Sequence, residues 1–414
     1  MADVAGAPAT KVMRAAARRH AQVDGDGMTT REPVPGILRA RPLAIGLLVV
    51  AIGLAVYTGF RAPSAWTATL HSVSVTDGFR RRVLVGTLLR PLALATDYDY
   101  WVFAGWSFLV SAAVLGVVVG VYLRTGSASV RLLIVGWLLL PTGGYFFHEV
   151  GYYDHVLYLL LFAALWLLHR NRVVLAVAVM TLSVLAHEIT VLTVLPIFAM
   201  VALWRLAFWR ALAALAPPAL VTGAVLLAVA PAAPGATGRL AATVAQADFP
   251  YRPDALALFN RTQSQSWQLY SVSKVLLYLA PFLTIAVVAF LVLRLVGDAL
   301  TVNVSRPPLA LVHGVIAAAA ITMPATLAFA GWDKDRWGFL LVTNLVVVLV
   351  LHLRHTGREL TPPQVAVLVA AMLLITHLPL SYFDGYAPRP LHWTAIRQFL
   401  SEVVHGHVFV IPTR

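Results

Sequence analysis

The sequence contains no cysteine, which excludes disulfide bonds, thiol catalysis and cysteine-ligated metal centres. Charged residues are also scarce, at 12% of the 414 residues, whereas an average soluble domain has roughly a quarter. Only three of the 31 basic residues are lysines, and the arginines are scattered between apolar runs. The formal net charge of +13 therefore does not indicate binding to a nucleic acid.

Hydrophobic residues make up 60% of the chain and gather in long runs, many close to the roughly 17–25 residues that cross a bilayer. We therefore predict an all-α polytopic membrane protein with about 11 transmembrane helices, whose partner is the lipid bilayer. The predicted spans are residues 43–60, 101–123, 130–147, 154–168, 173–187, 189–204, 211–231, 271–293, 309–329, 337–353 and 364–380.

The polar and apolar stretches also predict the domain organisation. Residues 1–41 are polar and read as a disordered cytosolic tail, and residues 42–380 form the transmembrane domain. Its long outer loops are residues 61–100 and 232–270. Residues 381–414 form an extracytoplasmic C-terminal segment with an amphipathic helix at 392–405. Basic early loops then place the N-terminus in the cytoplasm of a multi-pass plasma-membrane protein.

The run 173–204 decides the orientation of every segment that follows it. As one helix it would be about 48 Å long, against roughly 30 Å of hydrocarbon, and it would bury His187 and Glu188 in mid-bilayer. Two short spans that place His187 and Glu188 at the outer surface cost less free energy than one long helix that buries them. A ten-span alternative would invert every later segment.

The first outer loop carries the most informative motif. It contains Asp77, followed by Arg80, Arg81, Arg82 and Arg90. Read as an amphipathic helix at the outer surface, this stretch puts Arg82, Gly86 and Arg90 on one face. The two arginines would then clamp a phosphate or pyrophosphate, with Gly86 admitting the ligand close to the backbone. Alternatively, Asp77 only caps the helix and the arginines meet anionic lipid headgroups.

Two His-Glu pairs, His148-Glu149 and His187-Glu188, stand at the predicted outer ends of spans, and Asp154 follows the first pair. A carboxylate beside an imidazole can act as a general base or bind a sugar hydroxyl. Single residues of these types at span ends are otherwise ordinary interfacial residues.

Two further outer segments carry charged and aromatic residues. In the loop 331–337, Lys334 and Arg336 can bind phosphate oxygens while Trp332 stacks on a sugar ring, or all three belong to a surface network. Asp97 and Asp99 form a D-x-D pattern that can hold a divalent cation on a diphosphate. Their aromatic neighbours equally favour an interfacial belt. No other cofactor is indicated.

With its short spans, an acid in the first outer loop and arginines after it, the chain resembles the GT-C class of integral-membrane glycosyltransferases. The stretch Asp77-Gly-Phe-Arg-Arg-Arg is also similar to one in polysaccharide polymerases of the Wzy and EpsG kind. The resemblance implies a polyprenyl-phosphate-linked sugar donor and a catalytic base at Asp77. The chain departs from the class in lacking an adjacent acidic pair at this site and a soluble C-terminal domain.

We therefore expect a glycosyltransferase that moves a sugar from a polyprenyl-phosphate donor to a cell-envelope glycan or lipid on the extracytoplasmic face. Asp77, or in its place Glu149 or Glu188, would take the acceptor proton, and the arginines would stabilise the leaving phosphate. His148, Asp154 and His187 would contact substrate. The alternatives are a polymerase of lipid-linked repeat units, a transporter or flippase of lipid-linked or anionic solutes, and a scaffold without chemistry.

Overall fold

The computed structural model describes residues 40–228, 232–260, 262, 265, 268, 272, 307–327, 336–377 and 386–412. These residues form sixteen α-helices with short 3-10 turns, and no strand occurs among them. The predicted all-α fold is therefore confirmed for this part of the chain. The predicted tail 1–41, apart from its last two residues, and the predicted span 271–293, apart from Val272, lie outside the described residues.

The helices are numbered along the chain. They are α2 (Arg41–Gly59), α3 (Ala65–His71), α4 (Leu84–Ala95), α5 (Tyr100–Arg124), α6 (Ala128–Leu139), α7 (Pro141–His148), α8 (Tyr153–His169), α9 (Val173–Ala186), α10 (Val194–Arg205), α11 (Phe208–Gly223), α12 (Ala236–Thr243), α13 (Pro253–Ala257), α16 (Pro307–Thr322), α18 (Trp337–Thr356), α19 (Pro362–His377) and α20 (Trp393–Val404).

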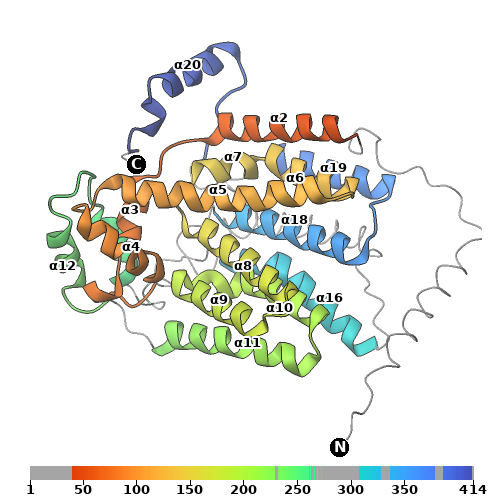
Figure 1. Cartoon of the computed structure of the whole chain (residues 1–414), viewed down its shortest axis with the longest axis horizontal. Coiled ribbons are helices and arrows are strands. Elements are labelled where there is room, and N and C mark those ends of the chain that lie inside the picture. The colour runs from red at the N-terminus through yellow and green to blue at the C-terminus, as the bar shows by residue number, and fades with distance from the viewer. Residues whose placement is uncertain are drawn as a thin grey trace, which may run out of the picture.

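The longer helices form one elongated bundle (Figure 1). We call one end of it the site end: it holds α3, α4 and α12 together with the first residues of α8 and α18, on the left of Figure 1. The opposite end holds the start of α2 and the last residues of α5, α8, α10 and α18. Contacts across the bundle agree with these directions, since Arg61 bonds to His148 at the site end and Tyr122 to Ala44 at the opposite end.

Among the described residues, four helices are long and apolar enough to cross a membrane: α2, α5, α18 and the run Phe208–Leu226. The pair α6 and α7, bent by 59°, makes a fifth if it forms one broken span. The bend falls at Pro141, which has no N–H to continue a helix, so the predicted span 130–147 consists of two helices and not of one continuous helix. The eleven predicted spans exceed this count for two reasons. Five of them correspond to α8, α9, α10, α16 and α19, which have only 12–17 residues each, and the predicted span 271–293 lies outside the described residues apart from Val272.

The predicted break within 173–204 is confirmed. His187 has extended backbone (φ −162°, ψ 132°) and ends α9, and a 3-10 turn over Glu188–Leu192 leads into α10. The two helices run in opposite directions, because the last residue of α10, Arg205, reaches His169 at the opposite end of the bundle. His187 and Glu188 are thereby placed at the site end.

The predicted surface helix over residues 77–90 is wrong in its first half. Asp77 ends a short 3-10 turn, and α4 begins only at Leu84. Between them, Gly78 and Arg82 adopt left-handed backbone conformations, with φ of 94° and 54°. A continuous helix cannot pass through two such residues.

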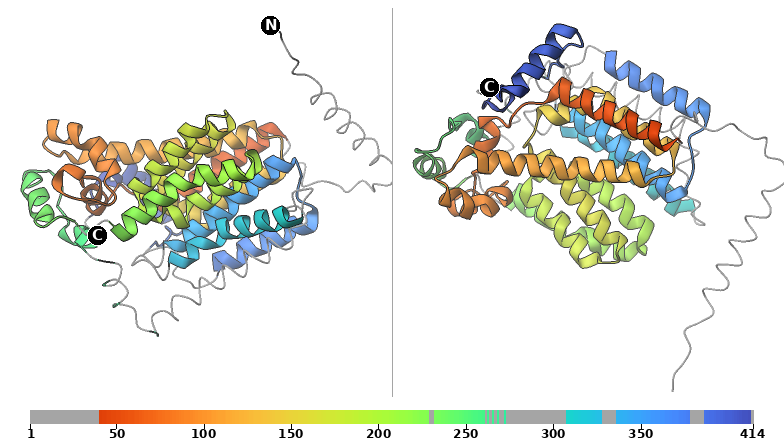
Figure 2. Two further views of the ribbon diagram at one scale, coloured as in Figure 1. Left: turned by 90° about the horizontal axis from the view of Figure 1, so that it is seen from below. Right: turned by 45° about the horizontal axis from the view of Figure 1, so that its top comes forward.

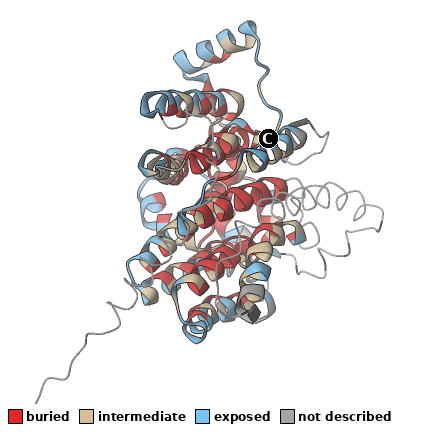
Figure 3. Cartoon of the chain, turned by 90° about the vertical axis from the view of Figure 1, so that its right-hand side faces the viewer, coloured by how far each residue is buried: buried red, intermediate tan, exposed pale blue. Residues whose placement is uncertain are grey.

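The bundle is held together by a polar contact in its centre. Asn344 of α18 is fully buried and donates to the carbonyls of Thr193 (2.9 Å) and Ala320 (2.7 Å). It also accepts a bond from the Tyr158 hydroxyl at 2.7 Å. One amide thus joins α8, α16, α18 and the start of α10, within the buried centre that Figure 3 shows in red.

The C-terminal segment packs beside the site end of α2 (Figure 2). The guanidinium of Arg389 donates to the carbonyls of Tyr57 and Phe60 at 3.0 and 2.8 Å, and Phe399 of α20 contacts the Tyr57 ring. The predicted helix at 392–405 is confirmed as α20, which the His392 side chain caps.

Candidate functional site

The turn between α7 and α8 positions two carboxylates at the site end. Glu149 and Asp154 stand on either side of Gly151, whose φ of 95° reverses the chain direction. A Cβ atom at Gly151 would lie 2.4 Å from Thr67 and 2.6 Å from Ser107, so the turn is wedged between α3 and α5. Glycine is needed here for both conformation and space.

Glu149 is buried and bound from two sides. Its Oε1 accepts from Nη2 of Arg61 at 2.6 Å and lies 2.7 Å from Nδ1 of its neighbour His148. Arg61 also donates to the His148 carbonyl at 2.7 Å, which fixes the pair. The second carboxylate oxygen, Oε2, is buried and has no hydrogen-bond partner among the described residues. Glu149 thus keeps one acceptor position for a further donor.

Arg82 and Glu188 form the most complete ion pair. Nη2 of Arg82 lies 2.6 Å from Oε1 of Glu188, and Nε lies 3.1 Å from both carboxylate oxygens. The Tyr153 hydroxyl bonds to the backbone carbonyl of Arg82 at 3.2 Å, which supports the left-handed conformation of this residue. His187 stands beside the pair, with Nδ1 at 3.3 Å from Glu188 and its ring against Tyr153.

Asp154 pairs with an arginine that is distant in the sequence, Arg336. Nε of Arg336, immediately before α18, lies 3.1 Å from Oδ2 of Asp154, and both side chains are at most 5% exposed. The guanidinium also lies over the rings of Tyr152 and Trp337, at 5.2 and 5.0 Å. Such burial requires that the two charges neutralise one another.

Asp77 pairs with Arg90 of α4 and is itself buried. Arg239 of α12 donates to the Asp77 backbone carbonyl at 3.1 Å, so the described part of the outer loop 232–270 packs directly onto this segment. Phe259 then connects two pairs, because it contacts Phe79 and also lies under the guanidinium of Arg82. The segment that follows Asp77 and the Arg82 guanidinium therefore pack against the same ring.

Electrostatics in the turn after α9 keep its carboxylate charged and its imidazole neutral. Burial alone would raise the pKa of Glu188, but Arg82 and His187 outweigh it and keep the pKa well below the usual range. Burial lowers the pKa of His187 to about 4, and the positive charge of Arg82 acts in the same direction. At neutral pH the cluster therefore contains a carboxylate, a guanidinium and a neutral imidazole.

The structure brings most of the predicted residues together but changes how they are arranged. The single-face clamp of Arg82, Gly86 and Arg90 is wrong, because the two arginines bind different carboxylates. Gly86 does not face a ligand: a Cβ atom there would lie 1.9 Å from the Val73 carbonyl oxygen. Asp77 does not cap α4 either.

Other predicted residues lie apart from these pairs or outside the described residues. Arg80 is exposed, and Arg81 is partly buried. The Asp99 side chain caps α5 by accepting from the Trp101 N–H at 2.6 Å. Within the described ranges, no three His, Asp or Glu side chains gather as metal ligands. Trp332 and Lys334 lie outside the described residues.

Sequence reasoning missed three residues that complete the site. Arg61 directly follows the first span, where it reads as an ordinary interfacial arginine. Tyr153 supports Arg82 and also bonds to the Leu70 carbonyl at 3.0 Å, and Arg239 reaches Asp77 from 162 residues away. Only the fold brings these segments together. The Gly-Tyr-Tyr-Asp-His stretch, which leads into the first turn of α8, is the one signal that points to Tyr153.

The site thus consists of four arginine–carboxylate pairs at one end of a helical bundle: Arg61–Glu149, Arg82–Glu188, Arg90–Asp77 and Arg336–Asp154. Such an arrangement offers carboxylates for proton transfer and guanidinium groups for phosphate oxygens. Comparison with protein-family models, curated proteins and solved structures finds no match to the chain.

Proposed function

We propose that the protein is a membrane glycosyltransferase that transfers a sugar from a polyprenyl-phosphate-linked donor to a glycan or lipid acceptor. One observation carries the proposal: five separate chain segments bring four arginine–carboxylate pairs, each with a buried or half-buried carboxylate, to one end of an apolar bundle. Buried pairs are costly to maintain, and ionisable groups at membrane depth generally mark function. Their position at helix ends favours chemistry on a substrate at the membrane surface over transport through the bundle.

The donor phosphate would be bound by guanidinium groups. Arg82 and Arg336 are the best candidates, because the Arg336–Asp154 pair is buried and the Arg82–Glu188 pair is only 20% and 15% exposed. Charge stabilisation is strongest in such desolvated surroundings. A donor phosphate arriving beside them would share these guanidinium groups with Glu188 and Asp154. The negative charge that develops on the leaving phosphate would then be stabilised by groups already in place.

The acceptor hydroxyl needs a base. Asp77 is the residue that the resemblance to the GT-C class selects, and it stands in a buried site beside Arg90. Glu149 is the second candidate, because its buried Oε2 has no partner among the described residues. Either carboxylate would accept the acceptor proton as the glycosidic bond to the new oxygen forms and the bond to the donor phosphate breaks.

We further propose that the shorter apolar helices cross the membrane together with the long ones, and that the site end faces away from the cytoplasm. Arg41, the first residue of α2, lies at the opposite end and follows a basic tail in the sequence, so the positive-inside rule assigns this end to the cytoplasm. Of the ten described acidic residues, only Glu359 lies at that end.

A reconstituted transfer assay tests the proposal. The wild-type protein in liposomes, supplied with radiolabelled polyprenyl-phosphate sugars and envelope lipid extract, should produce a glycosylated lipid or glycan. Asp77→Asn should reduce the rate by about 10²–10⁴-fold, the range of general-base catalysis. Asp254→Asn, a surface carboxylate 55% exposed and paired with Arg252, serves as the matched control and should retain the wild-type rate.

Product length separates transfer from polymerisation, because a polymerase extends its product into a ladder. Transfer by Asp77→Asn at the wild-type rate, with Glu149→Gln inactive, would move the base to Glu149. Absence of transfer from every donor would contradict the proposal.

A further inference from the structure

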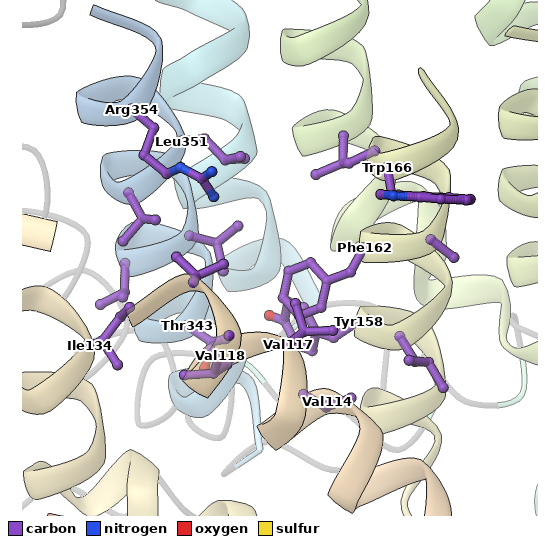
Figure 4. A pocket seen from close by; sticks show the side chains of 18 of the residues that line it. Val114, Val117, Val118, Ile134, Tyr158, Phe162, Trp166, Thr343, Leu351 and Arg354 are labelled. Atoms are coloured by element: carbon purple, nitrogen blue, oxygen red, sulfur yellow. The ribbon is translucent and has the colours of Figure 1, made fainter. Parts of the chain in front are cut away.

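An apolar groove of about 980 Å³ lies inside the bundle, away from the four ion pairs. Its walls come mainly from α5, α8 and α18, with contributions from α6 and α10 (Figure 4). Along α8 it extends from His155 to His169, about 21 Å at roughly 1.5 Å per residue. It is therefore long and narrow enough to take a hydrocarbon chain lying parallel to the helices.

The middle of the groove offers no polar recognition. Val114, Val117 and Phe162 are typical of its walls (Figure 4). The two polar side chains that line it are already used by the fold, since Tyr158 bonds to Asn344 at 2.7 Å and Thr343 to Trp137 at 3.0 Å. Any ligand in this part must be bound by apolar contact alone.

The arginines that line the groove all lie at its opposite end. There Arg124, Arg205 and Arg354 line it, from the last turns of α5, α10 and α18. In the described part of the chain none of these three forms an ion pair with a carboxylate. Arginine at a helix C-terminus is ordinary, but three of them around one apolar groove create a local excess of positive charge.

We propose that this groove is a binding site for an anionic phospholipid of the bilayer. The headgroup phosphate would lie against Arg124, Arg205 and Arg354, and one acyl chain would lie between α5, α8 and α18. Apolar walls with a basic rim match the two halves of such a molecule in hydrophobicity and charge. The site is separate from the proposed transferase chemistry and does not depend on it.

The charge distribution also selects this lipid over a polyprenyl phosphate with its phosphate at the site end. Neither Arg336 nor Asp154 lines the groove, and the groove residues nearest to them are Phe146, Phe339 and His155. His155 is buried and bonds to the Phe146 carbonyl at 3.0 Å. A lipid phosphate at the site end would therefore meet no cation in this groove.

Two glycines provide clean variants for the test. Gly120 lines the groove, and a Cβ atom there would meet nothing within 4 Å, so Gly120→Leu places a side chain in the groove from a position with open space at its base. Gly105 stands on the same helix, has equally open space and does not line the groove. Gly105→Leu is therefore the matched control. The control for the arginine variants is Arg172, which is exposed at the same end and does not line the groove.

The experiment measures lipid bound to the delipidated, purified full-length protein by native mass spectrometry. Dioleoyl phosphatidylglycerol and dioleoyl phosphatidylcholine are the probes, and size-exclusion elution confirms that each variant is folded. We expect one phosphatidylglycerol per chain, with phosphatidylcholine bound at least tenfold more weakly. Each of Arg124→Ala, Arg205→Ala and Arg354→Ala should weaken phosphatidylglycerol binding about fivefold, as expected for one arginine on an anionic lipid. Gly120→Leu should abolish binding, whereas Gly105→Leu and Arg172→Ala should bind as the wild type.

Three results would overturn the proposal. Equal binding of the two phospholipids would remove the role of charge. Equal loss in the groove variants and their controls would show that the lipid is bound elsewhere. The third result is that polyprenyl phosphate displaces phosphatidylglycerol and that its binding requires Arg336 instead of the three arginines. The groove would then bind a lipid in the opposite orientation, with its phosphate at the site end.

Discussion

Arg82 and Glu188 are 106 residues apart in the sequence, yet three of their N–O distances lie between 2.6 and 3.1 Å. The pair joins the first long loop at the site end to the turn between α9 and α10. Arg82 reaches Glu188 from a left-handed backbone conformation, supported by the Tyr153 hydroxyl at its carbonyl. A non-glycine residue in this conformation is uncommon and typical of functional sites.

A double variant of this pair separates its structural from its functional role. Glu188→Gln leaves the Arg82 charge without its partner and should destabilise the protein by about 3–5 kcal/mol. Arg82→Met combined with Glu188→Met removes both charges and should restore most of the stability, because apolar replacement of a buried pair is close to neutral. Thermal unfolding in detergent checks both.

The same double variant should remain inactive in transfer if Arg82 binds the donor phosphate. A double variant that is both stable and active would show that the pair only supports the fold. Arg252→Met combined with Asp254→Met, on a more exposed pair at the same end, is the control and should change neither property.

Much of the fold can be predicted from the sequence. Ten of the eleven predicted spans correspond to described helices, and the break at His187 follows from the length of the run 173–204. The bend at Pro141 and the late start of α4 were missed. In both cases a proline or a left-handed residue overrides a hydrophobic pattern that looks continuous. Periodicity reports which face is apolar but not where the backbone turns.

The site was predictable as a set of residues but not as a set of pairs. Asp77, Glu149, Asp154, Glu188 and their arginines stand out because charge is rare in an apolar chain. Which arginine meets which carboxylate depends on contacts between distant segments. The pairing of Arg336 with Asp154 joins residues 182 positions apart, and no local pattern encodes it.

The Asn344 amide should be important for stability but not for chemistry. Asn344→Leu removes three buried hydrogen bonds, worth about 0.6 kcal/mol each on average between membrane helices. We expect a loss of about 2 kcal/mol in the free energy of unfolding, measured in detergent, with transfer retained below the new melting temperature. Asn260→Leu, at an exposed position, should leave stability unchanged. Equal effects of the two variants would contradict the central role of Asn344.

Acid should destabilise the protein through its buried histidines. Burial lowers the pKa of His71 to about 4 from the ordinary value of 6.5, against a weaker opposing effect of the Gly151 backbone. Because the unfolded chain binds this proton more readily, the contribution to stability is complete above pH 6.5 and falls as the pH decreases toward 4. His187 has the same shift and adds to the effect.

Melting temperatures measured across this pH range check the prediction. His71→Gln should make the decline shallower, since one of the buried imidazoles is gone. His405→Gln, an exposed histidine on the C-terminal segment, is the control and should retain the wild-type slope. A steeper or unchanged slope in His71→Gln would contradict the assignment.

Gly86 should tolerate no side chain. A Cβ atom at this position would lie 1.9 Å from the Val73 carbonyl oxygen and 2.7 Å from that of His71, so α4 would have to move. Gly86→Ala should lower the free energy of unfolding by about 1–3 kcal/mol, as overpacking does in other protein cores. Gly105→Ala, in open space on α5, should be neutral or slightly stabilising, because alanine favours helix. Unfolding of both variants in detergent distinguishes a packing requirement from a general effect of glycine replacement.

Glycosidic linkage analysis of the cell envelope tests the central claim most directly. A strain lacking this chain would be complemented with the wild type, Asp77→Asn or Asp254→Asn, at matched protein levels in the membrane. We predict that one sugar linkage disappears in the deletion strain, returns with the wild type and with Asp254→Asn, and stays absent with Asp77→Asn. An envelope whose linkages are the same in all four strains would contradict the assignment of glycosyl transfer to the site end.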